Sequence, residues 1–248
     1  MQRYFIEQAN WEEDRVVIKG DDVHHIVRVM RMQKNDSLIC VHPERGPALC
    51  KIIAVEQEVI CSIKDWLDEN KELPVEVTIV QSLGKGDKLE QVVQKGTELG
   101  AHRFIPFNAE RSVAKWDAKK ANKKITRLQK IAKEASEQSE RAMVPAVFNV
   151  MTLSELIEQS SLHEVKLIAY ENEARSERSQ SLASRLREIK NDQRVIIIFG
   201  PEGGFTSEEA DKLFSGGFFP VRLGPRILRM ETAPLYFLSS LSYQLEEQ

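Results

Sequence analysis

Residues 195–206, with the sequence VIIIFGPEGGFT, join five consecutive apolar residues to a turn that contains three glycines. An apolar run of this length, ended by turn-forming residues, is typical of a strand buried on both faces of a parallel sheet. Many α/β proteins use such a strand and its glycine-rich turn to bring main chain close to a small ligand. The stretch therefore predicts an α/β fold with a ligand site where this strand ends.

A second glycine-bearing stretch, LGPRILRMETA at residues 223–233, precedes the apolar segment 234–245. Because the two stretches lie close together in the sequence, we expect both to line one pocket. The side chains around the second glycine are suited to enclose a flat ring such as adenine, whose faces favour apolar walls. The alternative is that these residues belong to an ordinary core.

The composition, with 42% hydrophobic and 29% charged residues, is that of a soluble globular protein. No apolar run approaches the roughly 20 residues of a membrane-spanning helix, and the first residues lack the apolar region of a signal peptide. Cys40, Cys50 and Cys61 are odd in number and lack the spacing of metal ligands. We therefore expect reduced thiols, no metal, no membrane contact and a cytoplasmic location.

The net charge of −3 is unevenly distributed along the chain. Residues 1–70 carry 9 basic and 13 acidic side chains, a net charge of −4, whereas residues 85–145 carry 14 and 8, a net charge of +6. A local basic excess permits contact with the phosphate groups of a nucleic acid. Solvated helix faces carry similar runs of charge, so the excess alone does not establish such a role.

Residues 1–70 are predicted to form a small β-barrel. Turn-forming clusters separate short segments with strand composition at residues 4–6, 15–18, 37–41, 49–55 and 59–63. The apolar spacing of residues 21–31 predicts one short helix with Asp21 or Asp22 as its N-cap. The polar segment 68–72 is typical of a domain linker.

Residues 74–248 are predicted to form a second domain in which strands and helices alternate. Helices are expected after Asp87, over 118–137, after Thr152, over 182–189, after Thr206 and at the C-terminus. Thr152 and Thr206 each precede a glutamate by three residues, which indicates a capping box. Strands are expected at residues 75–80, 104–107, 165–169, 195–199 and 221–223. The alternation predicts a mostly parallel sheet covered on both faces.

Several common catalytic signatures are missing from the sequence. It contains no G-x-G-x-x-G, no G-x-x-x-x-G-K-[ST] and no G-x-S-x-G, and its five histidines give no zinc pattern. This pattern favours chemistry in which a bound cofactor is the reactive partner. Methyl transfer fits, because S-adenosylmethionine carries an already activated methyl group and the protein need only align the acceptor.

The two glycine-bearing stretches resemble the cofactor loops of the RsmE family, the 16S ribosomal RNA uracil-N3-methyltransferases of the knotted SPOUT class. Further segments resemble the same family and extend the likeness over nearly the whole chain. They are RYFI at 3–6, HHIVRVMR at 24–31, KGDK at 85–88, QKGTELG at 94–100, ERSV at 110–113 and EASEQSER at 134–141.

The resemblance implies an α/β SPOUT domain with a C-terminal trefoil knot at residues 74–248 and a PUA-like RNA-binding barrel at residues 1–70. It also implies a homodimer that binds S-adenosylmethionine and methylates N3 of uracil 1498 in 16S ribosomal RNA of the small subunit. The cofactor-binding residues expected from the two loops are Phe199, Gly200, Pro201, Glu202, Gly203, Gly204, Leu223, Gly224, Ile227, Leu228, Thr232 and Ala233.

The proton on uracil N3 must leave before or during methyl transfer, which calls for a general base or for donors that stabilise the anion. The candidates are Arg229, Glu231, Glu98 and Glu202, and the sequence does not decide among them. His24 or His25 is a further possibility if the N-terminal domain folds over the site. The expected RNA contacts are Arg3, His25, Arg28, Arg31, Lys85, Lys95, Arg111 and Arg226.

Two other functions remain open at this point. The first is a SPOUT methyltransferase that acts on a ribose 2′-hydroxyl or on a transfer RNA base, since the loops describe the cofactor and not the acceptor. The second is a non-catalytic RNA-binding factor for ribosome assembly that keeps an unused pocket. The sequence does not indicate whether free RNA or an assembled particle is the substrate, or the order of binding.

Overall fold

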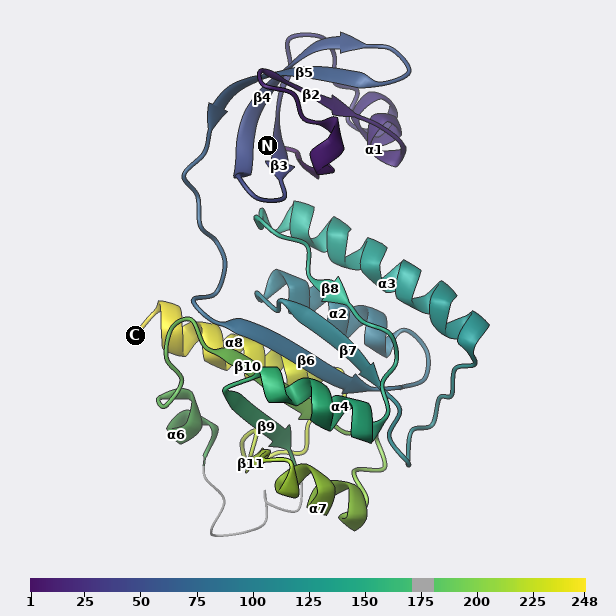
Figure 1. Cartoon of the computed structure of the whole chain (residues 1–248), viewed down its shortest axis with the longest axis vertical. Helices are drawn as coiled ribbons and strands as arrows, with labels where there is room; N and C mark the ends of the chain where they lie inside the picture. Colours follow the sequence, from purple (N-terminus) through teal and green to yellow (C-terminus); the bar gives the residue numbers. More distant parts are fainter. Residues whose placement is uncertain (171–180) are drawn as a thin grey trace. The chain divides into compact units, whose positions relative to one another are not determined.

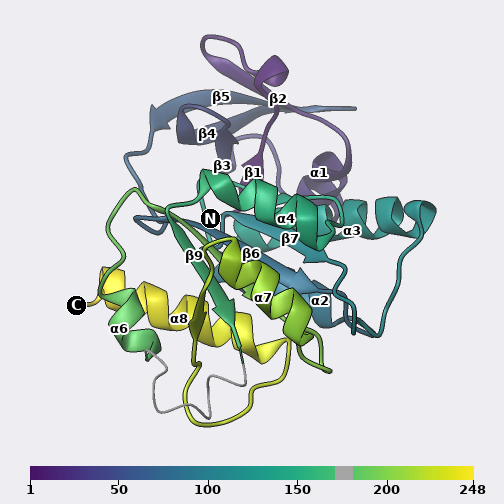
Figure 2. The same ribbon diagram turned by 60° about the horizontal axis from the view of Figure 1, so that its bottom comes forward.

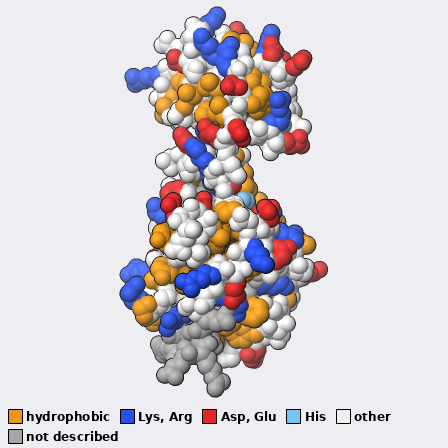
Figure 3. Space-filling view, turned by 90° about the vertical axis from the view of Figure 1, so that its left-hand side faces the viewer, with side chains coloured by type: hydrophobic (Ala, Val, Ile, Leu, Met, Phe, Trp, Pro, Cys, Tyr) orange, Lys and Arg blue, Asp and Glu red, His pale blue; other side chains and the backbone are white. Residues whose placement is uncertain are grey.

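The structure is a computed structural model that describes residues 1–170 and 181–248. The chain divides into two compact units, which we call unit 1 (Met1–Glu72 with Ser136–Val144) and unit 2 (Leu73–Ala135 with Pro145–Gln248). On the face in Figure 3, hydrophobic side chains lie among basic and acidic ones on both units. Among the described residues, no helix is both long enough and apolar enough to cross a membrane.

Unit 1 is built on a five-stranded sheet in the order β1-β3-β4-β5-β2. Its strands are β1 (Arg3–Phe5), β2 (Arg15–Ile18), β3 (Ser37–His42), β4 (Gly46–Val55) and β5 (Val59–Trp66). β1 pairs in parallel with β3, and the other neighbours are antiparallel. A short 3-10 helix, η1 (Gln8–Asn10), lies between β1 and β2. The five predicted strands are therefore present, and β1 and β2 are the edges of the sheet.

The single helix predicted in unit 1 consists of α1 (Asp21–His24) and a π-helical continuation, η2 (His25–Val29). Its expected N-cap was wrong: Gly20 occupies that position with a φ of 68°, and both aspartates lie in the first turn. A backbone with positive φ favours glycine, so the chain enters this helix through its conformation rather than through a side-chain cap.

The core of unit 1 contains three cysteines on neighbouring strands. Cys40 of β3 lies opposite Ala48, Cys50 of β4 opposite Leu38, and Cys61 of β5 opposite Ile52. All three are free thiols and completely buried. They pack with Tyr4, Ile18, Ile26 and other apolar residues of the same cluster, so they act as small hydrophobic side chains.

Two buried arginines connect the segment Ser136–Val144 to the rest of unit 1. Arg141 donates from Nε to the carboxylate of Glu72 at 3.0 Å, and Arg3 donates to the main-chain oxygen of Arg141 at 3.2 Å. Arg3 also pairs with Glu69 at 2.9 Å, and its side chain is 1% exposed. The prediction of Arg3 as an RNA contact was therefore wrong: its guanidinium is used inside unit 1, where leaving a partner charge unpaired is costly.

Unit 2 contains a six-stranded sheet in the order β11-β9-β10-β6-β7-β8, and every pair in it is parallel. The strands are β6 (Glu76–Ser82), β7 (Arg103–Phe107), β8 (Ala146–Val147), β9 (Val165–Ala169), β10 (Arg194–Phe199) and β11 (Phe219–Val221). The predicted parallel α/β sheet is confirmed. The last strand lies two residues earlier than expected.

Helices cover both faces of this sheet, as Figures 1 and 2 show. They are α2 (Lys88–Glu98), α3 (Ala118–Gln138), α4 (Leu153–Gln159), α6 (Leu182–Leu186), α7 (Ser207–Ser215) and α8 (Thr232–Glu246), with a 3-10 turn η3 (Ser160–Leu162) after α4. On one face Leu156 of α4 and Leu213 of α7 pack against Ile196 and Ile198 of β10. On the other, Phe237 of α8 contacts the ring of Phe199, as alternation along a strand requires.

The helix starts agree with the sequence signals at two of three positions. Thr152 and Thr206 each form a capping box with the glutamate three residues later, before α4 and α7. Asp87 precedes α2, but its carboxylate does not cap the helix and instead accepts a hydrogen bond from Gln91. α6 ends at Leu186, three residues before the expected end.

Candidate active site

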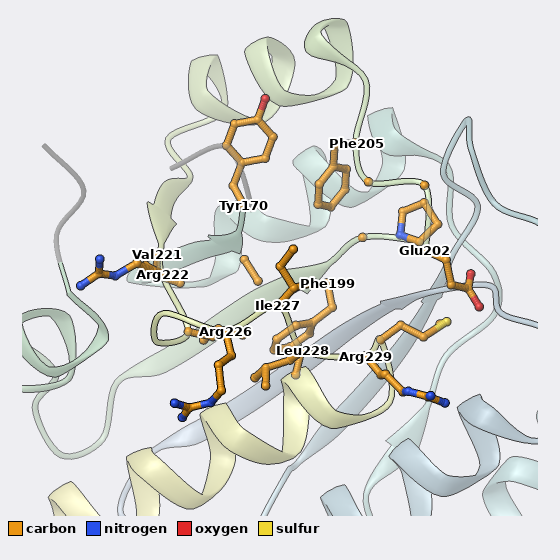
Figure 4. Close-up of a pocket in the computed structure, with 18 of the residues that line it drawn as sticks. Tyr170, Phe199, Glu202, Phe205, Val221, Arg222, Arg226, Ile227, Leu228 and Arg229 are labelled. Atoms are coloured by element: carbon orange, nitrogen blue, oxygen red, sulfur yellow. The ribbon is translucent and has the colours of Figure 1, made fainter. Parts of the chain in front are cut away.

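A cavity of about 700 Å³ lies in unit 2 where the central parallel strands end. Tyr170 follows β9, Gly200 follows β10 and Arg222 follows β11, and all three line it. Carboxyl ends of neighbouring parallel strands meet at one edge of a sheet, which is where ligands bind in open α/β folds. The cavity has the volume typical of a small-molecule site, and Figure 4 shows its walls.

Two loops form most of the wall, and we call them the first loop (residues 200–206) and the second loop (residues 222–231). The cavity is lined by residues 199–205 and 221–230, together with Lys88, Arg111, Ala169, Tyr170 and Ala233. The prediction that both glycine-bearing stretches line one pocket is therefore confirmed.

The first loop is fixed by its own glycines and by a neighbouring arginine. Gly204 has a φ of 66° and donates its N–H to the main-chain oxygen of Pro201 at 2.9 Å. A Cβ on Gly200 would lie 2.9 Å from the ring of Phe205, so only glycine permits this packing. Arg111 donates from Nη1 to the main-chain oxygen of Gly203 at 3.1 Å.

The ammonium group of Lys88, at the start of α2, connects the two loops. Its Nζ lies 2.7 Å from Oε1 of Glu202 in the first loop and 3.7 Å from Oε2 of Glu231 in the second. The hydrogen bond to Glu202 raises the pKa of Lys88. Burial acts to raise the pKa of Glu202, but the Lys88 hydrogen bond, a backbone hydrogen bond and the charges of Lys88 and Lys85 outweigh it and lower that pKa. Glu202 is therefore held as a carboxylate.

The second loop presents apolar side chains to the cavity. In Figure 4 Ile227 and Leu228 lie next to the ring of Phe199, whereas the side chain of Arg226 extends away from them. Ile227 is 72% exposed. Gly224 has a φ of 82°, which allows the turn at the base of this loop.

The structure brings together all but one of the predicted cofactor-binding residues. Thr232 is the exception: it is exposed at the first position of α8 and does not line the cavity, so its role stays a prediction that the cavity does not support. The chain turns into the helix at this point and directs Ala233, not Thr232, toward the pocket.

The four candidates for the proton transfer fall into three groups. Glu202 and Arg229 line the cavity, and Glu231 lies beside it through its contact with Lys88. Glu98 is the last residue of α2, about 15 Å along the helix axis from Lys88. Its assignment was wrong, because helices that follow parallel strands run away from the edge where the cavity lies.

The predicted RNA contacts lie in several places. Arg111 and Arg226 line the cavity, and Lys95 is exposed on α2. In unit 1 Arg28 and Arg31 are exposed at the end of the helix, and Nδ1 of His25 is hydrogen-bonded to the hydroxyl of Tyr4 at 2.9 Å. Lys85 lines a second cavity of unit 2. Their roles stay predictions.

Sequence reasoning missed the connecting role of Lys88. Its position does carry a signal, since it starts the helix that follows β6 and so lies at the ligand-binding edge of the sheet.

Among the described residues no group of three or more histidine, cysteine or acidic side chains is placed to hold a metal ion.

Two family models match the chain. A model described as the RNA methyltransferase domain matches residues 71–242, and one described as the RNA methyltransferase PUA domain matches residues 18–64. The parallel sheet, the cavity at its carboxyl edge and these matches define the class of the molecule as an RNA methyltransferase.

The relatives narrow this class. The chain is 46% identical to ribosomal RNA small subunit methyltransferase E of Bacillus subtilis over 250 residues, which cover 99% of this chain and 98% of that protein. It is 31% identical to the enzyme of the same name from Synechocystis, over 94% of this chain and 75% of that protein. The chain belongs to the ribosomal RNA small subunit methyltransferase E family.

Two solved structures with bound S-adenosylmethionine share the fold. The ribosomal RNA small subunit methyltransferase E of Neisseria gonorrhoeae superposes with a TM-score of 0.84 at 28% identity, over 98% of this chain and 97% of that chain. A putative methyltransferase from Legionella pneumophila gives a TM-score of 0.85 at the same identity and the same shares of both chains. The fold is a SPOUT-type α/β unit with a PUA-like N-terminal unit, and the cofactor is S-adenosylmethionine.

The residues of the cavity fit this cofactor. The two glycine-bearing loops bring main chain to the cavity wall, where Gly200, Gly203, Gly204 and Gly224 all line it. Phe199, Ile227 and Leu228 supply an apolar wall for a flat ring. Among the described residues, Glu202 is the one acidic residue of the cavity lining, and its carboxylate is paired with Lys88 at 2.7 Å.

Proposed function

We propose that this protein transfers the methyl group of S-adenosylmethionine to N3 of one uridine of 16S ribosomal RNA. The proposed position is uracil 1498, the target that the family resemblance implies. The observation that carries the proposal is the single cavity formed by GPEGGFT and LGPRILRMETA, the two stretches in which the chain most resembles uracil-N3-methyltransferases. The small-subunit methyltransferase names of its relatives support the substrate class.

The bound cofactor supplies an activated methyl group, so the residues of this chain must hold the uracil and remove its N3 proton. Arg229 lines the cavity and has no acidic partner among the described side chains. Its guanidinium would donate to a uracil oxygen and stabilise the negative charge that develops on deprotonation. Arg226, at the exposed rim, would contact a phosphate of the same RNA.

Glu231 is better suited than Glu202 to take the proton. Glu202 accepts a hydrogen bond from Lys88, and its lowered pKa makes it a weak base. Glu231 is 18% exposed, and its Oε2 accepts no hydrogen bond from the described residues. This acceptor is buried beside Lys88 and next to the cavity lining, and it would take the proton once the uracil lies against it.

Residues 1–70 would dock the RNA through Arg28 and Arg31, and residues 74–248 would carry the reaction. The target base would leave its stack to enter the cavity.

We also propose a trefoil knot in the C-terminal segment, a homodimer and a cytoplasmic location, all on family resemblance. Light scattering of the purified protein tests the dimer: a mass equal to one chain of 28.4 kDa would contradict it.

The test of the reaction is methylation of small-subunit ribosomal RNA from a strain that lacks this protein, as free RNA and as 30S particles. Purified enzyme and labelled S-adenosylmethionine are added, and the RNA is digested and analysed by mass spectrometry. We expect 3-methyluridine at one position, and less label with the Gly203→Val variant when S-adenosylmethionine is limiting. Label on a ribose or on another base would reject the N3 assignment. No label on either substrate, with cofactor still bound, would favour a binding role.

A further inference from the structure

Unit 2 contains a second cavity, of about 380 Å³, that the proposed reaction does not use. It lies between the start of α2, the segment before α3 and one face of α3. We call it the lysine cavity, and its lining comprises Gly84, Lys85, Gly86, Leu89, Glu90, Val113, Ala114, Lys115, Trp116, Lys120, Lys124 and Leu128.

The charge of the lysine cavity is strongly positive. Four lysines and a single acidic residue, Glu90, line it. The carboxylate of Glu90 already forms two ion pairs, through Oε1 with Nζ of Lys124 at 3.2 Å and through Oε2 with Nη2 of Arg127 at 2.7 Å. Lys85, Lys115 and Lys120 have no carboxylate within 4.0 Å among the described residues. Three ammonium groups around one hollow, without internal partners, favour an anionic ligand.

The same cavity offers a surface for a flat ring. Trp116 is half-buried between Lys115 and the start of α3 and stacks on no other described aromatic residue. Val113, close by, is 49% exposed, while Leu89 and Leu128 form a buried apolar floor. An accessible tryptophan among lysines is how proteins hold single-stranded nucleic acid, because bases stack on the ring and phosphates meet the charges.

The lysine cavity lies next to the cofactor cavity in the chain and in space. The turn that connects β6 to α2 separates them: Gly84, Lys85 and Gly86 line one and Lys88 lines the other. The charge of Lys85 acts on Glu202 across this turn. A polynucleotide with one base in the cofactor cavity therefore has its neighbouring nucleotides within reach of the lysine cavity.

We propose that the lysine cavity binds a nucleotide adjacent to the target in single-stranded RNA, its base stacked on Trp116 and its phosphates held by Lys85, Lys115 and Lys120. The proposal rests on the proposed function, since it assumes that RNA enters the cofactor cavity. A free mononucleotide or inorganic phosphate would meet the same charges, but would gain nothing from the adjacent site.

The first test uses tryptophan fluorescence, because Trp116 is the one tryptophan of unit 2 and Trp11 and Trp66 stack on each other in unit 1. A hexamer of uridylate is titrated into the full chain with S-adenosylhomocysteine present. We expect quenching that saturates in the wild type and is lost in Trp116→Phe. Equal quenching in both proteins would overturn the proposal. Uridine monophosphate that binds as tightly as the hexamer would reduce the cavity to a mononucleotide site and also overturn it.

The second test separates RNA binding from cofactor binding. Trp116→Ala should raise the KM for ribosomal RNA about 5- to 150-fold, the range measured for loss of one base–aromatic stack. The Kd for S-adenosylmethionine should change less than twofold, and Trp116→Phe should restore most of the RNA affinity. An unchanged KM for RNA in a folded, cofactor-binding Trp116→Ala protein would refute the assignment.

A pair of lysines on α3 tests the phosphate contacts. Lys120 lines the cavity, whereas Lys123 is exposed on the same helix outside it. Each phosphate contact adds about 0.7 to the slope of log Kobs against log salt for single strands. Lys120→Ala should reduce that slope by about this amount and Lys123→Ala should reduce it less. Equal reductions would show that only the general charge of the helix acts.

These outcomes are distinguishable from failure of the proposed function. If mass spectrometry finds no 3-methyluridine but the hexamer still quenches Trp116, the lysine cavity binds RNA and the reaction is wrong. If 3-methyluridine forms while the Trp116 and Lys120 variants behave as wild type, the reaction is right and the cavity has no role in RNA binding.

Discussion

The first loop (200–206) is held along its whole length, whereas the second loop (222–231) is held only at its two ends. Pro201 and Phe205 of the first loop are buried, and Arg111 and Lys88 bind its middle. In the second loop, Arg222 forms a bridge to Ser181 and the buried Met230 packs on Gly84. The residues between them are mostly exposed.

Because of this difference, the two loops should contribute to the free energy of ligand binding in different ways. The first loop has the conformation of a preformed wall, so a ligand gains its contacts without ordering the chain. The second loop leaves an apolar side chain in water until a ligand covers it, so its contribution comes from burial during binding. We therefore expect substitutions in the first loop to change the shape of the cavity wall. Substitutions in the second loop should change the apolar area that is buried when a ligand binds.

The largest effect should come from Gly203→Val in the first loop. A Cβ there lies 3.3 Å from the Cβ of Arg111, and the branched side chain would also occupy the cavity wall. We expect the Kd for S-adenosylmethionine to rise about 10- to 100-fold, or ~1.4 to 2.7 kcal/mol, while the circular dichroism spectrum is unchanged. A folded variant with wild-type affinity in calorimetry would remove the first loop from the site.

A matched pair of glycines separates loop shape from general strain. Gly204 and Gly217 both have positive φ, and a Cβ on either would meet nothing within 4 Å. Alanine at each position should lower the free energy of unfolding by a similar ~1 kcal/mol. Only Gly204→Ala should weaken cofactor binding, because Gly217 lies outside the cavity lining. Equal losses of affinity would mean that stability, not loop shape, controls binding.

A smaller effect is expected from Ile227→Ala in the second loop. Ile227 is 72% exposed, so the free energy of unfolding without ligand should change by less than ~0.5 kcal/mol. The Kd for S-adenosylmethionine should rise about fivefold, ~1 kcal/mol, because the cofactor buries part of the side chain. Thermal melting with and without cofactor measures both quantities. A large loss of stability without ligand would show that the loop is already packed.

A still smaller effect should follow from Lys88→Gln, which removes the connection between the loops. Its partners are partly exposed, so we expect a rise of about threefold in the Kd for the cofactor. Without the ammonium group, burial should raise the pKa of Glu202, so the variant should lose affinity at a higher pH than the wild type as pH falls. Lys95→Gln, on the same helix outside the cavity, is the control. Identical pH profiles for the wild type and Lys88→Gln would contradict the connection.

The smallest effect concerns the sheet beneath both loops. His163 is hydrogen-bonded through Nε2 to Thr78 of β6 at 2.9 Å, and burial, then the charges of Arg103 and Arg194, lower its pKa. The folded state therefore binds fewer protons than the unfolded state below the ordinary histidine pKa of about 6.5. Stability from this group is complete above that pH and falls as pH drops through the lowered pKa. Chemical denaturation between pH 7 and pH 5 should show a shallower decline in His163→Gln.

Local sequence patterns predicted those parts of the fold that depend on neighbouring residues. The strands and the capping boxes at Thr152 and Thr206 follow from spacing within a few residues, and the shared cavity follows from two glycine-bearing stretches that lie close together in the sequence. Glu98 was wrongly grouped with the site although the direction of a helix after a parallel strand places its C-terminus away from the cavity. That error came from following a motif instead of the topology.

The remaining features depend on residues far apart in the sequence. Lys88 and Glu202 are separated by 114 positions, and Arg141 and Glu72 by 69. Each such pair forms only when the fold brings two segments together, so neither spacing nor composition indicates it. For the same reason the sequence suggests that the basic side chain of Arg3 contacts RNA, whereas the fold buries it against Glu69.

The three buried cysteines allow the unfolding of unit 1 to be measured separately from that of unit 2. Cys40, Cys50 and Cys61 all belong to unit 1, and the sequence has no other cysteine. A thiol reagent cannot reach them in the native state, so the rate of labelling reports the opening of unit 1 alone. In a variant with Trp11 and Trp66 replaced by phenylalanine, the fluorescence of Trp116 would report on unit 2 in the same sample. Comparing thiol labelling with this fluorescence during unfolding would reveal whether the two units open together.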